Sequence, residues 1–189
     1  MTKLKLISDP PLNGYKKKFG GITLEAPNNL AVVSMALPLG GEAAAMRAIK
    51  AAYGAALPEP GKSTLSKDKK ARLVRMSSDQ AFVIFTNAKA DAEPKVNAAI
   101  KGKAYTTDQT DAWSGLQISG KGVRDALERI CPVDLHPDQF GIDDAARTMM
   151  EHLGVLIVRI GTDKYLLMSA SSSAGSFLHA VETSIKNAA

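Results

Sequence analysis

Two parts of this chain follow the same order of predicted elements, and that repetition constrains the fold more than any single motif does. Residues 30–104 predict a strand, a helix, two strands and a second helix, and residues 105–189 predict the same order. Such an order favours an α+β fold, in which helices cover one face of a mainly antiparallel sheet. We therefore expect two related halves, 30–104 and 105–189, that form one compact unit.

The individual elements rest on apolar periodicity and on turn residues. In the first half we expect strands at 30–37, 71–76 and 81–86, with helices that begin at Glu42 and span about 92–100. In the second half we expect strands at 115–119, 155–160 and 165–168, a weaker strand at 146–152 and a helix at 122–130. Phe177, Val181 and Ile185 lie four residues apart and predict the inner stripe of a last amphipathic helix.

Two segments lack such patterns. Residues 1–29 contain several prolines and glycines and little periodicity, so we expect an extended arm that lies on a partner. Residues 57–70 contain Pro58, Pro60 and Gly61 and predict irregular structure.

Size and composition restrict the class of protein. At 189 residues with 45% hydrophobic residues, the chain can form a full core. Its apolar runs are far shorter than the ~20 residues that cross a bilayer, and Asp9-Pro10-Pro11 interrupts any signal peptide. The lone cysteine excludes an internal disulfide. We expect a cytoplasmic protein with no membrane partner.

The charge is unevenly distributed. Residues 1–104 hold 17 Lys or Arg and 8 Asp or Glu, a balance of +9, whereas residues 105–189 hold 7 and 11, a balance of −4. The lysines cluster at 16–18 and at 67–70, in segments with few aromatic residues. A nucleic-acid groove interleaves basic and aromatic side chains, so we expect no nucleic-acid partner and favour solvated loops or a surface that faces a protein.

The segment from Cys131 to Pro137 predicts a structural corner. Pro132 ends the preceding helical pattern, and the Asp134 carboxylate can accept a backbone N–H in a tight turn. His136 can bond a carbonyl through one ring nitrogen. Cys131 and His136 also allow a metal site or a thiol nucleophile, but zinc needs further ligands and no cationic cluster surrounds the thiol.

Other signals for chemistry are weak. The chain has no Gly-x-Gly-x-x-Gly after a strand, no phosphate-binding Gly-x-x-x-x-Gly-Lys-Ser/Thr and no Gly-x-Ser-x-Gly. Gly120-Lys121-Gly122 precedes a helix, where it allows phosphate binding or, more simply, a strand-to-helix turn that needs flexible φ angles. We assign no catalytic, cofactor-binding or metal-binding residue.

Several of these stretches together resemble one protein family. They are residues 110–120 (TDAWSGLQISG), Ala126-Leu127, 131–137 (CPVDLHP) and the closing 176–178 (SFL), and they resemble the gamma subunit of heterotetrameric sarcosine oxidase. The resemblance spans about residues 30–185 and is most specific from 107 to 182. Arg72-Leu73 and Ser78-Asp79-Gln80 are similar to that family's hairpin, although Ala81-Phe82 stands where the family has a Trp.

The resemblance implies a fold like the folate-binding domain of aminomethyltransferases. In that wider group, acidic residues after a Gly-Gly pair carry the folate chemistry, and the corresponding stretch here, 153–158 (LGVLIV), has no carboxylate. Apolar side chains cannot relay a proton. The resemblance thus implies a non-catalytic subunit of an oxidoreductase complex.

The resemblance also implies the partners. Alpha, beta and delta subunits would carry FAD, FMN, NAD and tetrahydrofolate, with zinc on the small subunit, and sarcosine would be demethylated to glycine. The alternatives are a subunit of a related N-methyl amino acid dehydrogenase, a free-standing folate or anion binder that uses residues 120–122 and the basic half, and a Cys131-based catalyst.

Overall fold

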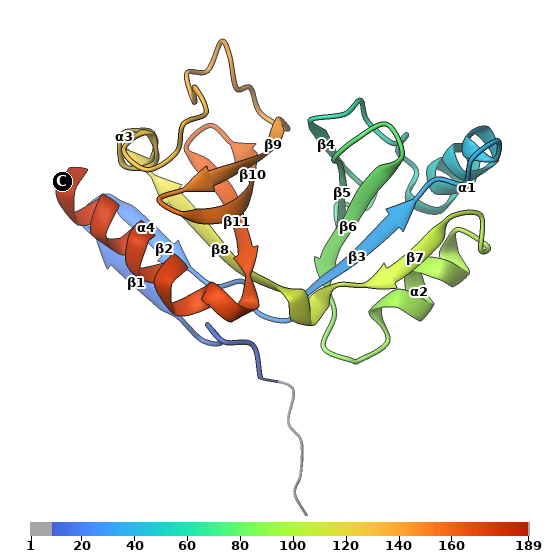
Figure 1. The fold of residues 1–189 in the computed structure, drawn as a ribbon, viewed down its shortest axis with the longest axis horizontal. Helices are drawn as coiled ribbons and strands as arrows, with labels where there is room; N and C mark the ends of the chain where they lie inside the picture. The colour runs from blue at the N-terminus through green and yellow to red at the C-terminus, as the bar shows by residue number, and fades with distance from the viewer. Residues whose placement is uncertain (1–8, 189) are drawn as a thin grey trace, which may run out of the picture.

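Two antiparallel sheets form the body of the protein in the computed structural model, which describes residues 9–188 (Figure 1). The first sheet has the order β4-β5-β6-β3-β7, with β3 Leu30–Ala36, β4 Lys62–Leu65, β5 Ala71–Arg75, β6 Gln80–Thr86 and β7 Tyr105–Asp108. The second has the order β1-β2-β8-β11-β10-β9, with β1 Lys16–Phe19, β2 Ile22–Glu25, β8 Trp113–Gly120, β9 Ala145–Met150, β10 Leu153–Gly161 and β11 Lys164–Ala170. The predicted α+β class is confirmed.

The central strands read as continuous apolar runs because both of their faces are buried. In β10, Val155 and Ile157 face the helices, whereas Leu156 and Val158 face the other sheet. The cluster between the sheets joins Val32, Val74, Phe82 and Ile84 of the first sheet to Ala145, Leu156, Val158, Leu166 and Met168 of the second. The molecule is therefore layered as helices, sheet, sheet, helices (Figure 1).

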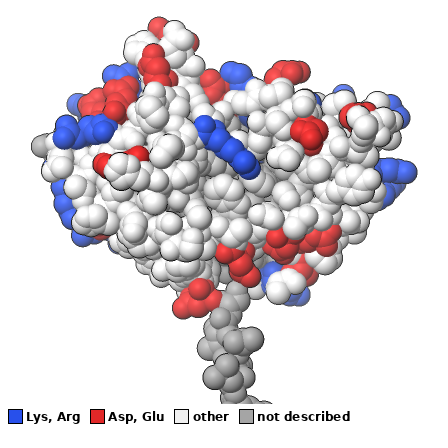
Figure 2. Space-filling view, in the orientation of Figure 1, with Lys and Arg blue, Asp and Glu red and all other residues white. Residues whose placement is uncertain are grey.

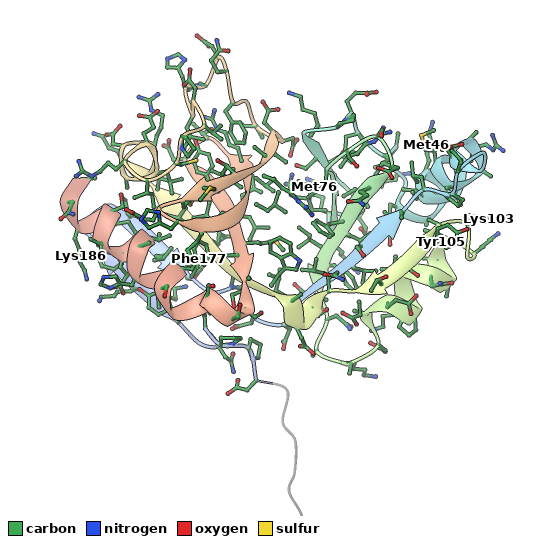
Figure 3. The ribbon with its side chains drawn as sticks, in the orientation of Figure 1. Met46, Met76, Lys103, Tyr105, Phe177 and Lys186 are labelled. Atoms are coloured by element: carbon green, nitrogen blue, oxygen red, sulfur yellow. The ribbon has the colours of Figure 1, made fainter. Side chains whose placement is uncertain are left out.

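The helices cover the outer faces. α1 Glu42–Tyr53 and α2 Ala92–Ala99 lie on the first sheet, and α3 Val123–Glu128 and α4 Ala174–Ala188 lie on the second. The predicted stripe of Phe177, Val181 and Ile185 is buried against the second sheet, and Figure 3 shows Phe177 within α4 and Lys186 near its end. No helix among residues 9–188 is long and apolar enough to cross a membrane.

The arm predicted for residues 1–29 is wrong for its central part. β1 and β2 form a hairpin around Gly20-Gly21, and β2 pairs with β8, so the hairpin extends the second sheet. Leu24 is fully buried in that half's core. Residues 1–8 of the predicted arm lie outside the described residues.

Side chains fix the hairpin to the last helix. The Tyr15 hydroxyl donates to Glu182 Oε1 at 2.5 Å, and Lys186 lies 3.0 Å from the other carboxylate oxygen. These bonds, led by that from Tyr15, lower the pKa of Glu182 to about 2. Two of the clustered lysines, which we expected on solvated loops or on a surface that faces a protein, form ion pairs within the chain: Lys16 with Glu25 at 2.7 Å and Lys17 with Glu182 at 3.4 Å.

The predicted repeat is confirmed, and each half has three strands between its two helices instead of the two in the predicted order. After its first strand each half has a helix, three strands and a second helix, because β4 occupies part of the segment predicted to be irregular, and β9 the place of the weaker strand. The predicted boundary at residue 105 is also wrong, since β7 pairs with β3 of the first sheet. β7 lies beside β3 at one edge of the first sheet, and the β1–β2 hairpin lies beside β8 and forms one edge of the second, so each sheet is extended by a segment outside the repeat.

A polar clasp joins the two halves where β4 meets the loop before β9. The Arg72 guanidinium, on a residue only 9% exposed, donates to Asp143 Oδ1 at 2.5 Å and to Ser63 Oγ at 2.7 Å. The Ser63 amide donates to the Asp143 carbonyl at 2.6 Å, and the Ala145 amide to the Gly61 carbonyl at 2.8 Å. The clasp therefore fixes how the sheets sit at this edge.

The surface carries mixed charge. On the face drawn in Figure 2, basic and acidic groups are interspersed and separated by uncharged surface. Exposed apolar side chains include Tyr105 and Met46, which Figure 3 places on the outer side of the first half. This face has no continuous basic stripe of the kind that follows a nucleic-acid backbone.

Candidate functional site

The Cys-Pro corner is built as predicted. α3 ends at Glu128, and the Cys131 amide donates to the Leu127 carbonyl at 2.9 Å. The Asp134 carboxylate accepts the His136 amide at 2.9 Å, which is the expected turn. His136 differs from its prediction: its ring Nδ1 accepts the Asp138 amide at 3.4 Å rather than donating to a carbonyl.

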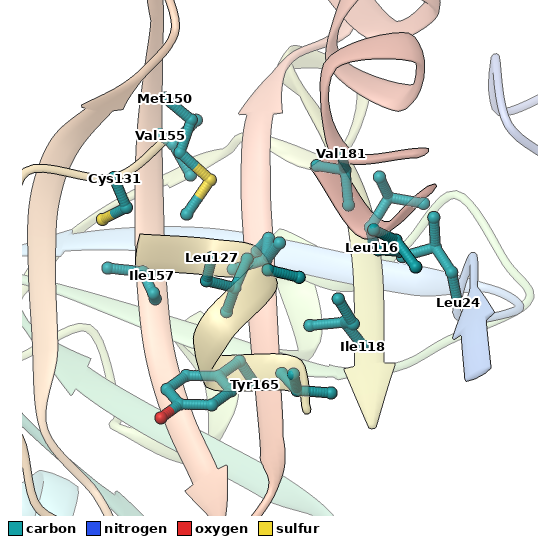
Figure 4. Packing of buried hydrophobic residues seen from close by; sticks show 14 of the residues in the cluster. Leu24, Leu116, Ile118, Leu127, Cys131, Met150, Val155, Ile157, Tyr165 and Val181 are labelled. Carbon is teal, nitrogen blue, oxygen red and sulfur yellow. The ribbon is translucent and has the colours of Figure 1, made fainter. Parts of the chain in front are cut away.

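The corner is poorly suited to thiol chemistry. Cys131 is 6% exposed, and Figure 4 shows it within the same cluster as Met150, Val155 and Ile157. Burial raises the pKa of its thiol above an ordinary value that already favours the protonated form at pH 7. His136, by contrast, is exposed. Residues 9–188 contain no group of three or more His, Cys, Asp or Glu side chains placed to hold a metal ion.

Gly120-Lys121-Gly122 forms the turn between β8 and α3. Gly120 has φ 121° and Gly122 φ 90°, which L side chains rarely adopt. A Cβ on Gly120 would lie 2.0 Å from the Gly21 carbonyl oxygen, so the hairpin approaches this backbone closely. The simpler interpretation, a turn that needs flexible φ angles, accounts for both glycines.

A small pocket of about 250 Å³ adjoins this turn. Arg124, Arg159, Asp125 and Asp163 contribute charges of both signs to its lining. The Arg159 guanidinium is already used, since it donates to the Phe140 carbonyl at 2.6 Å and to Thr162 at 2.9 Å. Anion binding at residues 120–122 stays a prediction. The charged side chains that line this pocket sum to zero and give it no excess positive charge that would attract an anion.

The stretch that corresponds to the folate-active segment lies inside β10. The side chains of Val155 to Val158 are all buried, alternately under the helices and between the sheets. Packing on one side or the other therefore accounts for the burial of all four side chains.

A second concavity, in the first half, was not predicted from the sequence. It is a groove of about 830 Å³ on the outer face of the first sheet, between the carboxyl end of α1, α2 and the β4–β5 turn, and we call it the α1–α2 groove. Its lining residues are Ala51, Ala52, Tyr53, Gly54, Ser66, Lys67, Asp68, Lys70, Ala71, Val83, Phe85, Thr86, Asn87, Lys95, Val96 and Ala99. The sequence signal at this place is the lysine cluster 67–70, one of the two that the charge distribution singled out.

The groove has an apolar floor and a basic rim. Val83 and Val96 are buried, Phe85 and Tyr53 are half-buried, and burial raises the pKa of the Tyr53 hydroxyl to about 12. Tyr53 is therefore a neutral hydroxyl at physiological pH and cannot act as a base there. The groove thus combines an apolar floor with lysines at its rim.

Comparison with known proteins agrees with the family resemblance. No family model matches the sequence. The sarcosine oxidase subunit gamma of an Arthrobacter species is 26% identical over 121 residues, 64% of this chain and 60% of the relative. The subunit gamma of Corynebacterium sp. strain U-96 is 34% identical over 59 residues, 31% of this chain and 29% of the relative. The matched part thus covers less than two thirds of either relative's length.

The fold has solved counterparts. A chain of the heterotetrameric sarcosine oxidase from Corynebacterium sp. U-96 superimposes with a TM-score of 0.74 at 21% identity, over 88% of this chain and 84% of that one. Aminomethyltransferase T of the Bartonella henselae glycine cleavage system gives a TM-score of 0.61 at 12% identity, over 85% of this chain and 45% of that one. The expected likeness to the aminomethyltransferase fold is confirmed, and so is the resemblance to sarcosine oxidase gamma subunits.

Proposed function

We propose that this chain is a non-catalytic gamma subunit of a heterotetrameric sarcosine oxidase. The observation that carries the proposal is the double similarity, in sequence to curated gamma subunits and in fold to a chain of the tetramer. The complex would oxidise sarcosine to glycine in the cytoplasm. The methyl carbon would leave as formaldehyde or as methylene-tetrahydrofolate, with hydrogen peroxide as the reduced product.

The disposition of the polar side chains supports a structural role. Arg72 and Arg159 are buried and satisfy oxygen atoms of the fold, and the Cys131 thiol is buried with a raised pKa. We assign FAD, FMN, NAD and tetrahydrofolate to the alpha and beta subunits, and zinc to the small delta subunit. This chain would contribute surfaces for assembly.

Affinity purification from the source organism tests the proposal. A tag on this chain should bring down flavoprotein subunits whose complex consumes oxygen when sarcosine is added, whereas the isolated chain should show no turnover. If the purified complex oxidises a different N-methyl amino acid, or passes electrons to an acceptor other than oxygen, it is a related dehydrogenase. Calorimetric binding of tetrahydrofolate to the isolated chain at micromolar concentration would favour the free-standing binder instead.

A further inference from the structure

The two helices of the first half leave a groove between them, whereas the two helices of the second half are in direct contact. In the second half α4 runs for 15 residues and meets α3, and the Ser184 hydroxyl donates to the Ala126 carbonyl at 2.5 Å. α2 follows β6 as α4 follows β11, but it runs for only 8 residues. Among the described residues no hydrogen bond joins α1 to α2, and the α1–α2 groove lies between them.

The exposed floor of the groove favours an apolar occupant. Phe85 and Tyr53 are only half-buried, and Ala51, Ala52 and Ala99 are exposed along the walls. Covering apolar surface is favourable in proportion to the area removed from water. The volume of about 830 Å³ lies in the range typical of small-molecule pockets, so the choice between a small ligand and a protein segment depends on how open the walls are.

The rim favours negative charge on the occupant. Lys67 and Lys70 are exposed, and within residues 9–188 neither forms an ion pair, whereas Lys95 pairs with Asp91 at 3.0 Å. Among the described residues the Asp68 carboxylate forms no ion pair with either lysine; it accepts the Ser66 hydroxyl at 2.6 Å and the Lys70 amide at 3.1 Å. Its single negative charge stands against two positive ones, so this turn remains basic. These bonds fix the β4–β5 turn, which therefore presents Lys67 and Lys70 at a defined place beside the floor.

The openness of the walls favours a protein segment over a small molecule. A buried small-molecule site covers most of the ligand surface, whereas most side chains along this rim are exposed, among them Lys67, Lys70, Thr86, Lys95 and Ala99. A chain segment that belongs to a larger partner needs no such enclosure, because the partner covers the outer side.

We propose that the α1–α2 groove docks an acidic, apolar segment of a protein partner, with apolar side chains on the Val83–Phe85 floor and carboxylates beside Lys67 and Lys70. The partner completes in the first half the helix layer that α4 completes in the second. This inference rests on the proposed function, since the partner is taken to be a large subunit of the oxidase complex.

Paired variants test the groove in the native complex. Lys67→Glu with Lys70→Glu reverses the rim charge, and Ala51→Trp fills the groove from an exposed position. The controls are Lys121→Glu, on the exposed turn before α3, and Ala43→Trp, on an exposed position of the same helix α1. We expect the groove variants to reduce capture of the flavoprotein complex by about tenfold, with unchanged melting temperature, and the controls to match the wild type.

The outcomes separate the two proposals. If the wild-type chain captures no flavoprotein, the proposed function and the groove both fail. If it captures the complex and the groove variants behave like the controls, the groove proposal is overturned and the proposed function stands. Native mass spectrometry of the isolated chain gives a further test: a stoichiometric organic anion, lost from the Lys67→Glu/Lys70→Glu variant, would replace the protein partner by a small molecule.

Discussion

The clasp between the halves predicts an asymmetric response to removal of its two charges. Arg72 is 9% exposed, whereas the Asp143 side chain is 46% exposed. Asp143→Asn preserves shape and tolerates the left-handed φ of 73° at this residue, but it leaves a buried guanidinium without its counter-charge. Arg72→Met keeps an apolar stem and leaves a carboxylate that water can reach.

The magnitudes follow from this difference in burial. Removing one partner of a fully buried pair costs about 3–5 kcal/mol, so for this half-exposed pair we expect about 2–3 kcal/mol for Asp143→Asn. For Arg72→Met we expect about 1–2 kcal/mol, the loss of hydrogen bonds to a charged group. The double variant should be close to Arg72→Met alone, because the neutral Asn no longer faces a buried charge.

Urea unfolding at pH 7 of the wild type, both single variants and the double variant completes the thermodynamic cycle. Hydrogen exchange should report the same event locally, because the Ser63 and Ala145 amides donate across the junction of the halves and should lose protection first. Additive costs, or a larger cost for Arg72→Met than for Asp143→Asn, would refute the assignment of Arg72 as the buried and dependent charge.

Three further measurements test other contacts. The hydrogen bonds from Tyr15 and Lys186 lower the pKa of Glu182 from 4.5 to about 2, so the stability that this carboxylate contributes is complete above pH 4.5 and is lost as the pH falls through 2. Glu182→Gln should cost about 1–2 kcal/mol in urea unfolding at pH 7, the value for hydrogen bonds to a charged group reduced for the exposure of the two lysines, and it should flatten the loss of stability at acid pH. An unchanged acid dependence would contradict the contact. Gly120→Ala should lower stability by about 2 kcal/mol or more, because the new Cβ would lie 2.0 Å from a carbonyl oxygen. The control Gly154→Ala, whose Cβ meets nothing within 4 Å, should change stability by less than about 0.5 kcal/mol. Equal melting temperatures for the two variants would contradict the close approach at Gly120. Iodoacetamide should alkylate Cys131 at least about 100-fold more slowly in the native chain than in urea, and fast native labelling would show an accessible thiol.

The sequence predicted the central strands and the long helices because burial leaves a strong pattern. β10 and β11 are apolar on both faces, and α4 has a clear inner stripe. The resemblance led us to expect a Trp where Ala81-Phe82 stands; Phe82 is buried there and packs edge-on against Trp113 with ring centroids 5.7 Å apart.

Three of the strands that were missed or misplaced, β1, β4 and β7, are edge strands, in which that pattern is weak. β2 lies between β1 and β8 and was missed although Ile22 and Leu24 alternate with polar residues. β1 presents Lys16, Lys17 and Lys18, and lysines on an edge protect it from pairing with other chains. A signal was present, because Gly20-Gly21 between Phe19 and Ile22 is a typical two-residue hairpin turn. β4 is similarly short and polar. We assigned β7 to the second half because its partner strand β3 lies about 70 residues earlier in the chain, and neighbouring strands are more often close in sequence.

The α1–α2 groove could not be predicted from periodicity, because it results from how far apart two helices lie on a sheet. Its floor residues, Val83, Phe85 and Val96, read as ordinary core residues of β6 and α2. The lysine cluster at 67–70 predicted either a solvated loop or a surface that faces a protein, and it indicated neither the volume of the groove nor its apolar floor.

Size-exclusion chromatography of native extract, followed by antibody against this chain and by flavin absorbance, tests the central claim most directly. The account predicts that the chain elutes at a mass far above its own 20.0 kDa, in fractions that contain flavin and oxidise sarcosine. A chain that elutes near 20.0 kDa without flavin, or that turns over sarcosine by itself, would contradict it.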